Sequence, residues 1–324
     1  MLSRTADHLY WMARYMERAE NTARMLDVSY QTSLLPQSAL QVEISWRGLL
    51  SISELTEDYN KRFGEITPQQ VMHFMVCDAQ NPSSIYNCLR SARENARAVR
   101  GTLTTEVWET QNQTWLEFQR MIVDQPLQKD PGAVFEWVKF RSHLSRGVAV
   151  GTMLQDESFH FLRLGSFLER ADNTARMVDV KFHAAENKFI ATPQRRVTNA
   201  SYAEYDFYHW SAILRSLSGF EVYRKVYRNV IHPEKVAELL ILRADMPRSL
   251  AACMDEVVTN LQHVANEHSH ETLRLAGRLQ ADLKFSRIDE ILSAGLHPFL
   301  IQFLDRVNAI GVGISRDFLV PIRP

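Results

Sequence analysis

The sequence predicts an all-α fold built from two copies of one helical unit. Among its 324 residues, Gly occurs 12 times and Pro 11 times, each below average usage, which argues against the turn-rich β classes. No run of alternating apolar and polar residues is long enough to predict a strand. Apolar residues make up 45% of the chain, enough for a sizeable core. The remaining evidence for the fold class is an internal repeat.

A segment near the N-terminus recurs in the middle of the chain. Residues 2–28 align with residues 154–180 at a constant offset of 152, with 12 identities in 27 positions. The most similar part reads YMERAENTARMLDV in the first copy and FLERADNTARMVDV in the second. The polar identities include the pairs His8/His160, Glu17/Glu169, Arg18/Arg170, Asn21/Asn173, Arg24/Arg176 and Asp27/Asp179. Such self-similarity at a fixed offset indicates repeated architecture.

Similarity continues downstream in the same order. Trp46 and Trp210 match at an offset of 164, and Pro68/Pro233, Pro82/Pro247 and Cys88/Cys253 match at 165. SRGVAVG at 145–151 pairs with DRVNAIG at 305–311. We interpret the series as an ancestral duplication into repeats of about 1–151 and 152–324. Because the helix predicted at 145–151 runs almost directly into the second repeat, we expect one domain, 1–324, in which both halves share a core about a pseudo-twofold axis.

Several segments carry signals for the start of a helix. TPQQVMHFM and HPEKVAELL each place Pro at the first helical position, and NPSSIYNCLR and MPRSLAACMD repeat that pattern. The least structured segment is NKFIATPQRRVTN, residues 187–199, which we predict to be a connection.

Charge and cysteine content narrow the class of protein. The net charge is −1 and no long Lys/Arg run occurs, so we expect no nucleic-acid partner. No apolar run approaches the ~20 residues that span a bilayer, and the N-terminus lacks an apolar signal-peptide core. The three cysteines form neither a CxxC pair nor a disulfide framework, which fits a reducing compartment. We therefore expect a cytoplasmic protein without a membrane segment.

The repeated helix carries a narrow polar stripe. On a helical wheel, Glu17, Asn21, Arg24 and Tyr10 fall within a narrow sector, and the remaining faces are largely apolar. A helix that is apolar on most sides is buried, so the stripe is predicted to lie inside the protein. A buried carboxylate needs a partner.

The pseudo-twofold axis suggests which residues are the partners of the buried carboxylates. Glu17 would face Arg176 or Arg170, and Glu169 would face Arg24 or Arg18. Arg146 and Arg306, which are aligned in the repeat, are further candidates. The predicted cluster comprises Glu17, Arg18, Asn21, Arg24, Arg146, Glu169, Arg170, Asn173, Arg176 and Arg306.

Two interpretations of this cluster stay open. In one, the Glu, Arg and Asn side chains satisfy one another and only fix helix register. In the other, Arg exceeds Glu, and the surplus guanidinium groups hold a carboxylate or phosphate. Catalysis by Glu17 or Glu169 as an acid or base is disfavoured, because nearby Arg should lower the carboxyl pKa.

No metal or nucleotide cofactor is predicted. Glu-x-x-His occurs at 157–160 and 267–270, but the first motif has Thr5 in place of Glu in its repeat partner, and the second is expected near a helix end. Neither GxxxxGK[ST] nor GxGxxG is present. Cys88 and Cys253 lie on apolar faces, where Cys usually fills space.

The two ER pairs, together with LSRTADHLYWMARY at the start, resemble the Alpha-E family over essentially the whole chain. That family is described as a helical domain with a Glu-Arg motif. Glu17, Arg18, Glu169 and Arg170 occupy the motif positions. The resemblance implies a setting beside ATP-grasp proteins, which form amide bonds, and transglutaminase-like proteins.

Two hypotheses for function follow, with a scaffold as the third possibility. The first is an accessory or co-catalytic module that binds an acidic group of a peptide or amino acid for an ATP-grasp-type ligase. The second is an independent enzyme that acts on a carboxylated or phosphorylated small molecule at the same cluster. The third is a purely structural scaffold.

Overall fold

The protein is all-α in the computed structural model, which describes residues 1–34, 38–124, 127, 129–191, 207 and 210–319. No strand occurs within these ranges. The helices of the first repeat are α1 (Ser3–Ser33), α2 (Ala39–Ile52), α3 (Thr56–Asn60), α4 (Pro68–Val76), α5 (Ile85–Ala98), the short 3-10 helix η1 (Arg100–Thr102), α6 (Thr105–Asp124) and α7 (Pro131–Thr152). Those of the second are α8 (Glu157–Ala191), α10 (Phe220–Tyr227), α11 (Pro233–Ile241), α12 (Leu250–His263), α13 (His270–Phe285), α14 (Ile288–Ala294) and α15 (Leu296–Phe318).

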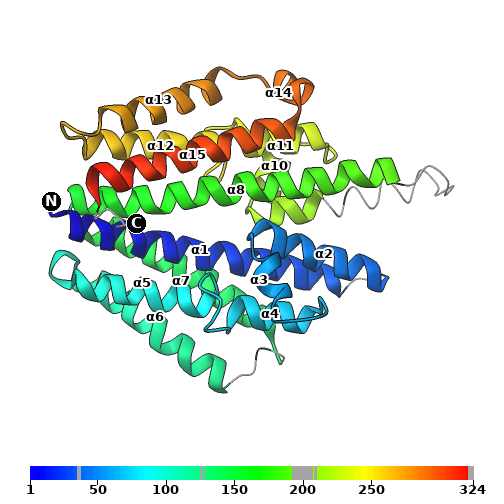
Figure 1. The fold of residues 1–324 in the computed structure, drawn as a ribbon, viewed down its shortest axis with the longest axis horizontal. Coiled ribbons are helices and arrows are strands. Elements are labelled where there is room, and N and C mark those ends of the chain that lie inside the picture. The colour runs from blue at the N-terminus through cyan, green and yellow to red at the C-terminus, as the bar shows by residue number, and fades with distance from the viewer. Residues whose placement is uncertain (35–37, 125–126, 128, 192–206, 208–209, 320–324) are drawn as a thin grey trace.

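The two repeated helices, α1 and α8, lie side by side at the centre and run in the same direction (Figure 1). Helices α5 and α7 pack on α1, and α6 covers them from outside. Helices α12 and α15 pack on α8, and α13 covers them in the same way. Each central helix therefore carries an equivalent set of flanking helices, and the ER motifs lie at the middle of the molecule.

Helix boundaries in the two halves follow the offset found in the sequence. Helices α4 and α11 both have nine residues and begin at Pro68 and Pro233, where Pro has no N–H to leave unpaired. Helices α5 and α12 both have 14 residues. Each follows a Ser, Ser84 or Ser249, whose hydroxyl accepts a hydrogen bond from the third helical backbone N–H.

The histidines of the repeat make matching contacts. The Nδ1 atom of His8 lies 2.8 Å from Oδ1 of Asn95, and Nδ1 of His160 lies 2.8 Å from Oδ1 of Asn260. These histidines anchor the central helices to α5 and α12. Neither belongs to a candidate metal site, since within the described residues no group of three or more His, Cys, Asp or Glu side chains could hold a metal ion.

Both repeats contribute to one continuous apolar core. It includes Trp46 and Leu89 from the first repeat and Leu164 and Leu240 from the second. Burial of these side chains, at about 25 cal/mol per Å² of apolar surface, is the main favourable contribution to the free energy of folding.

Two features of the chain bear on the sequence predictions. Helix α8 continues to Ala191, so residues 187–191 of the predicted connection are helical, and residues 192–199 lie outside the described ranges. None of the described helices combines the length and the apolar character needed to cross a bilayer.

Candidate anion-binding cluster

The two ER motifs pair with each other across the α1–α8 interface. The carboxylate of Glu17 accepts hydrogen bonds from Nε and Nη2 of Arg170, both at 2.9 Å. Glu169 in turn accepts from Nε of Arg18 at 2.6 Å and from its Nη2 at 3.1 Å. Glu17 is 1% exposed and Glu169 is 6% exposed, so both motifs lie in the interior.

This reciprocal pairing follows from the parallel arrangement of the helices. Residues at the same level of α1 and α8 are sequence equivalents, and adjacent residues point about 100° apart around a helix. Each Glu can therefore meet the Arg of the other copy. Of the alternatives left open by the sequence, Arg170 is the partner of Glu17 and Arg18 is the partner of Glu169.

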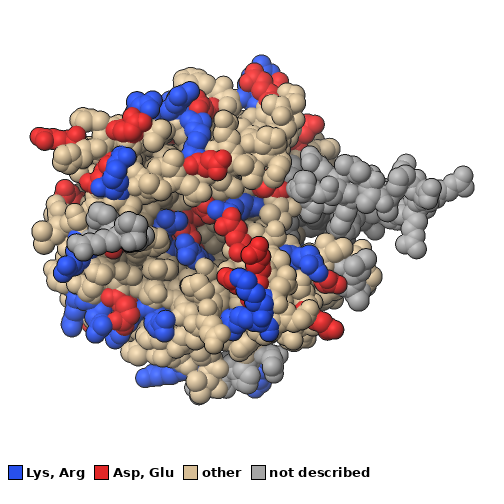
Figure 2. Space-filling model, viewed as in Figure 1, with Lys and Arg blue, Asp and Glu red and all other residues tan. Residues whose placement is uncertain are grey.

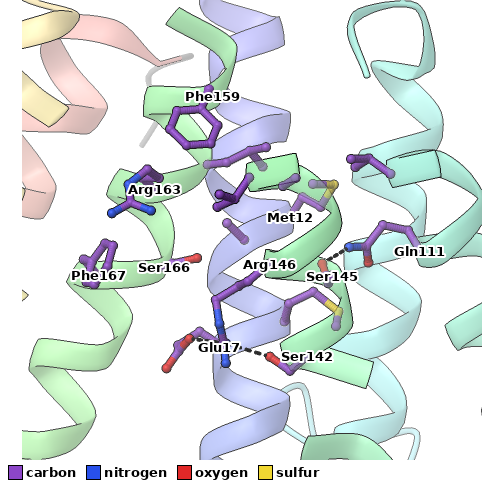
Figure 3. A pocket seen from close by; sticks show the side chains of 16 residues that line it. Met12, Glu17, Gln111, Ser142, Ser145, Arg146, Phe159, Arg163, Ser166 and Phe167 are labelled. Atoms are coloured by element: carbon purple, nitrogen blue, oxygen red, sulfur yellow. Dashed lines mark hydrogen bonds and ion pairs between the residues drawn. The ribbon is translucent and has the colours of Figure 1, made fainter. Parts of the chain in front are cut away.

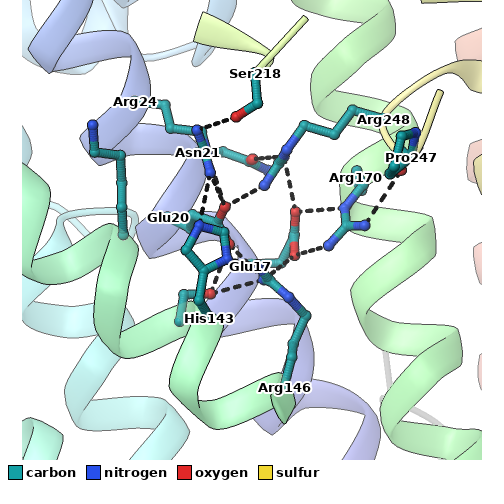
Figure 4. Close-up of polar contacts among 12 residues, drawn as sticks. Glu17, Glu20, Asn21, Arg24, His143, Arg146, Arg170, Ser218, Pro247 and Arg248 are labelled. Atoms are coloured by element: carbon teal, nitrogen blue, oxygen red, sulfur yellow. Dashed lines mark hydrogen bonds and ion pairs between the residues drawn. The ribbon is translucent and has the colours of Figure 1, made fainter. Parts of the chain in front are cut away.

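A larger charged network surrounds Glu17 on the side of α7 and α12 (Figure 4). Glu20, one turn along α1, is fully buried beside it. The guanidinium group of Arg146 lies 3.0 Å from Glu17 and 2.5 Å from Glu20. Arg248 bonds to both carboxylates and donates to Oδ1 of Asn21 at 2.9 Å, and Arg24 bonds to Glu20 at 2.8 Å.

Four guanidinium groups thus share the two carboxylates of this network, which leaves a formal charge of +2. We call this set the Glu17 cluster. Its members are Glu17, Glu20, Asn21, Arg24, Arg146, Arg170 and Arg248.

Around Glu169, by contrast, positive and negative charges are equal in number. Glu169 pairs with Arg14 at 2.7 Å as well as with Arg18. Arg176 pairs with Asp172 at 2.8 Å and with Glu54. Three acids meet three guanidinium groups here, so the surplus positive charge lies on the Glu17 side.

Some predicted members of the cluster lie elsewhere. Arg306 pairs with Asp282 at 2.7 Å on α13, away from the ER motifs, so its inclusion was wrong. Arg24 pairs with Glu20 rather than with Glu169, because the i, i+4 neighbour on its own helix is closer. For the same reason Arg176 pairs with Asp172 and does not meet Glu17.

Asn173 also differs from its repeat partner. The Oδ1 atom of Asn173 is buried and has no hydrogen-bond partner within the described part of the chain. Asn21, by contrast, accepts from Arg248. Among the described residues, Asn173 therefore makes no contact equivalent to the hydrogen bond between Asn21 and Arg248.

Four important residues were absent from the sequence prediction: Arg14, Glu20, His143 and Arg248. Glu20 and Arg14 could have been found on the wheel, since each lies three residues from Glu17 and borders the stripe. Arg248 could not, because its repeat equivalent at offset 165 is Ser83 and a search for shared residues passes over it.

The surrounding guanidinium groups keep the central carboxyls ionised. Burial alone would raise the pKa of Glu169, but Arg14 and Arg18 outweigh it and lower that pKa to about 2. Burial would also raise the pKa of Glu17 and Glu20. At Glu17 the nearby Arg170 outweighs burial, and at Glu20 Arg248 does so, and the pKa of each carboxyl is lowered. These Glu residues are poor general bases at neutral pH, as the sequence argument predicted.

Arg248 shows that the Glu17 cluster has more cations than its acids compensate. Burial lowers the pKa of Arg248 to about 10 despite contacts with Glu20 and Glu17, and repulsion from Arg170 and Arg24 acts in the same direction. At neutral pH the side chain is still charged. The folded protein therefore holds this cation at a cost in free energy.

His143, at the exposed edge of the cluster, lies between two guanidinium groups (Figure 4). Its Nδ1 is 2.7 Å from Nη2 of Arg146, and its Nε2 is 3.2 Å from Nη2 of Arg24. A neutral imidazole has one acceptor nitrogen, and guanidinium groups only donate, so one of these contacts places two donors together. Burial and the nearby Arg residues lower the pKa of His143, against the influence of Glu20.

A groove leads from the cluster toward the surface between α1, α6, α7 and α8 (Figure 3). Its cavity volume is about 70 Å³, and it is partly open to solvent. Glu17, Ser142 and Arg146 form its polar end, and Phe159 stands at the other end. On the face shown in Figure 2, basic side chains are interspersed with acidic ones.

The cysteines are not placed for nucleophilic chemistry. Cys88 and Cys253 are fully buried, and burial raises the pKa of each thiol to about 12. A thiol of this kind holds almost no reactive thiolate at neutral pH.

Fold and site together define an all-α protein whose two central helices exchange Glu–Arg pairs. The chain belongs to the Alpha-E family, described as a predicted α-helical domain with a conserved ER motif, and the family model matches residues 1–319. Similar curated proteins are the uncharacterized protein Mb2597 of Mycobacterium bovis and the uncharacterized protein MT2643 of Mycobacterium tuberculosis. Each is 22% identical over 94% of this chain and 35% of its own length. The chain thus spans about a third of these relatives. No solved structure matches it.

Proposed function

We propose that this protein is a helical accessory or co-catalytic module of an ATP-grasp-linked system that forms peptide or other amide bonds, and that the Glu17 cluster binds an acidic group, a carboxylate or a phosphate. The observation that carries the proposal is the excess of guanidinium groups, four against two carboxylates, in the interior. The charges around Glu169 cancel, so the excess of positive charge belongs to the Glu17 cluster alone.

The physical basis is the cost of uncompensated buried charge. Removing cations from water costs several kcal/mol per ion unless opposite charge is close by. A bound anion would supply that charge, and guanidinium groups suit carboxylate and phosphate because they donate two parallel hydrogen bonds. Arg146 is the natural point of contact, since its side chain is 29% exposed and faces both the cluster and the groove.

An accessory role is favoured over independent acid–base catalysis by the low pKa values of the three Glu residues. The resemblance to the Alpha-E family supports an ATP-grasp ligase as partner, with a transglutaminase-like protein as a further one. The three cysteines, which are all free, support a cytoplasmic location. The longer relatives leave room for other domains beside an Alpha-E region.

The test compares the chain alone with the chain plus its ATP-grasp ligase. ATP consumption and amide formation are measured for the wild type, Arg146→Gln and the repeat-equivalent control Arg306→Gln. We expect activity only with the ligase, a loss for Arg146→Gln and no change for Arg306→Gln. Amide formation by this chain without a ligase would instead support an independent enzyme. Unchanged ligase activity with only lower stability in Arg146→Gln would support a scaffold.

A further inference from the structure

We infer that the acidic group bound at the Glu17 cluster is a carboxylate carried by an apolar chain, with the carboxylate at Arg146 and the chain in the groove between α1, α6, α7 and α8. This inference rests on the proposed function and narrows its ligand class from any acidic group to an amphipathic monocarboxylic acid.

The groove is apolar along most of its length. Its walls away from the polar end are formed by apolar side chains of all four helices, and Arg146 is the boundary between these walls and the charged cluster. The apolar walls include Met12, Met16, Val107, Ala149, Phe159 and Leu162. A ligand that matches this groove has a charged end, which lies at Arg146, and an apolar remainder. Burial of that apolar remainder against the apolar walls is favourable.

The length of the groove also suits a chain. Phe167 lies near the charged end and Phe159 at the other (Figure 3), and their separation of eight positions along α8 corresponds to about 12 Å of helix. That length fits a medium-chain acyl or aryl-alkyl group. Inorganic phosphate or a short acid would leave these apolar walls uncovered.

A peptide backbone fits the same groove less well. Buried peptide groups need hydrogen-bond partners. Gln111 and Ser145, two of the polar side chains in the wall, are bonded to each other at 2.5 Å. An alkyl or aryl chain makes no such demand. For this reason we assign an apolar chain, not a polar peptide, to the groove.

The second guanidinium group in the wall, that of Arg163, is matched by one acid of its own and adds nothing to the surplus positive charge of the Glu17 cluster. Arg163 pairs with Glu256 at 2.6 Å, and its guanidinium carbon lies 4.9 Å from the ring centroid of Phe167 and 5.6 Å from that of Phe159. It therefore adds aromatic-stacked surface to the groove and offers no second site for an anion. The ligand is expected to carry a single acidic group.

The experiment measures binding of octanoate, acetate and octanol to the purified chain by isothermal titration calorimetry at fixed ionic strength. Octanoate should bind at least roughly tenfold more tightly than acetate, because several methylenes become buried. It should also bind at least roughly tenfold more tightly than octanol, which lacks the charge that Arg146 recognises.

Four variants locate the site. Arg146→Gln should lose octanoate binding and Arg146→Lys should restore part of it. Ala149→Phe, which fills the groove, should weaken octanoate at least roughly tenfold and leave acetate unchanged. Phe140→Ala, on the exposed outer face of α7, should change nothing, which controls for nonspecific binding. Circular dichroism confirms that each variant is folded.

The remaining outcomes separate the inference from the proposed function. Equal affinity for acetate and octanoate would overturn the assignment of an apolar chain to the groove. It would not contradict anion binding at the Glu17 cluster. Octanol binding as tightly as octanoate, or octanoate binding that Ala149→Phe does not weaken, would also overturn it. If neither acid binds, and if Arg146→Gln does not change amide formation in the presence of the ligase, both proposals fail.

Discussion

Gly165 of α8 lies directly against the backbone of Tyr10 in α1. A Cβ atom at Gly165 would be 2.2 Å from the carbonyl oxygen of Tyr10, far inside van der Waals contact. The repeat equivalent of Gly165 is Ala13, whose Cβ would be 3.2 Å away. One glycine therefore permits the close crossing of the central helices that brings the two ER motifs together.

Gly165→Ala should lower the free energy of unfolding by about 1–3 kcal/mol or more, because the helices must separate to admit one methyl group. The measurement is urea denaturation followed by circular dichroism. Gly277→Ala is the control, since that helical glycine has nothing within 4 Å of the added Cβ. It should be neutral or stabilising by up to about 1 kcal/mol. Equal effects of the two changes would contradict the close-packing argument.

Glu169 should make stability depend on pH in the acid range. Its folded pKa of about 2 is lower than its usual value of 4.5, so its contribution of about 3 kcal/mol is complete above pH 4.5 and is lost as pH falls toward 2. Glu169→Gln should be destabilised at pH 7, and the gap to wild type should close between pH 4.5 and pH 2.

Denaturant unfolding at several pH values measures that gap. Glu43→Gln, which removes an exposed carboxylate paired with Arg47, is the control and should show a small effect at every pH. A gap between wild type and Glu169→Gln that stays constant through the acid range would refute the assigned role of Arg14 and Arg18.

Arg170 and Arg248 should differ in their contribution to stability although both are buried and both contact Glu17. Glu17 raises the pKa of Arg170 despite its burial, whereas burial lowers that of Arg248. The charged form is thus favoured by folding at Arg170 and disfavoured at Arg248. Arg170→Met should cost about 3–5 kcal/mol, and Arg248→Met should cost less.

The two substitutions are compared by equilibrium urea unfolding at pH 7. Methionine keeps most of the apolar stem, so the difference reports mainly on charge. A larger loss for Arg248→Met than for Arg170→Met would show that the Glu17 cluster has no surplus of positive charge.

The buried cysteines should react with thiol reagents only when the protein opens. Burial raises the pKa of Cys88 and Cys253 to about 12 and that of Cys77, which is partly exposed, to about 11. With a disulfide reagent at pH 7.5, Cys77 should be labelled first, and the other two at the rate of unfolding. Mass spectrometry of digested samples identifies the labelled positions. Rapid labelling of Cys88 in native protein would contradict its structural role.

Much of the fold was predictable because short stretches of sequence determine where its helices begin. Proline at the first helical position, serine caps and apolar periodicity act within a few residues, and the helices starting at Pro68 and Pro233 begin where those signals place them. The burial of Glu17 followed from the apolar surface that surrounds it on the wheel. Contacts between the two ER motifs, such as that of Glu17 with Arg170, were among the predicted alternatives.

The composition of the cluster required the tertiary structure. Arg248 has no charged counterpart in the first repeat, and Arg306 aligns with Arg146 yet pairs with Asp282. The sequence by itself determined that two helices with Glu–Arg pairs lie in an apolar interior, because periodicity and burial are properties of each segment. Only the packing of α7 and α8 against α1, and of α12 against α8, decided that four guanidinium groups meet two carboxylates, because distances between segments far apart in the chain are set by the fold.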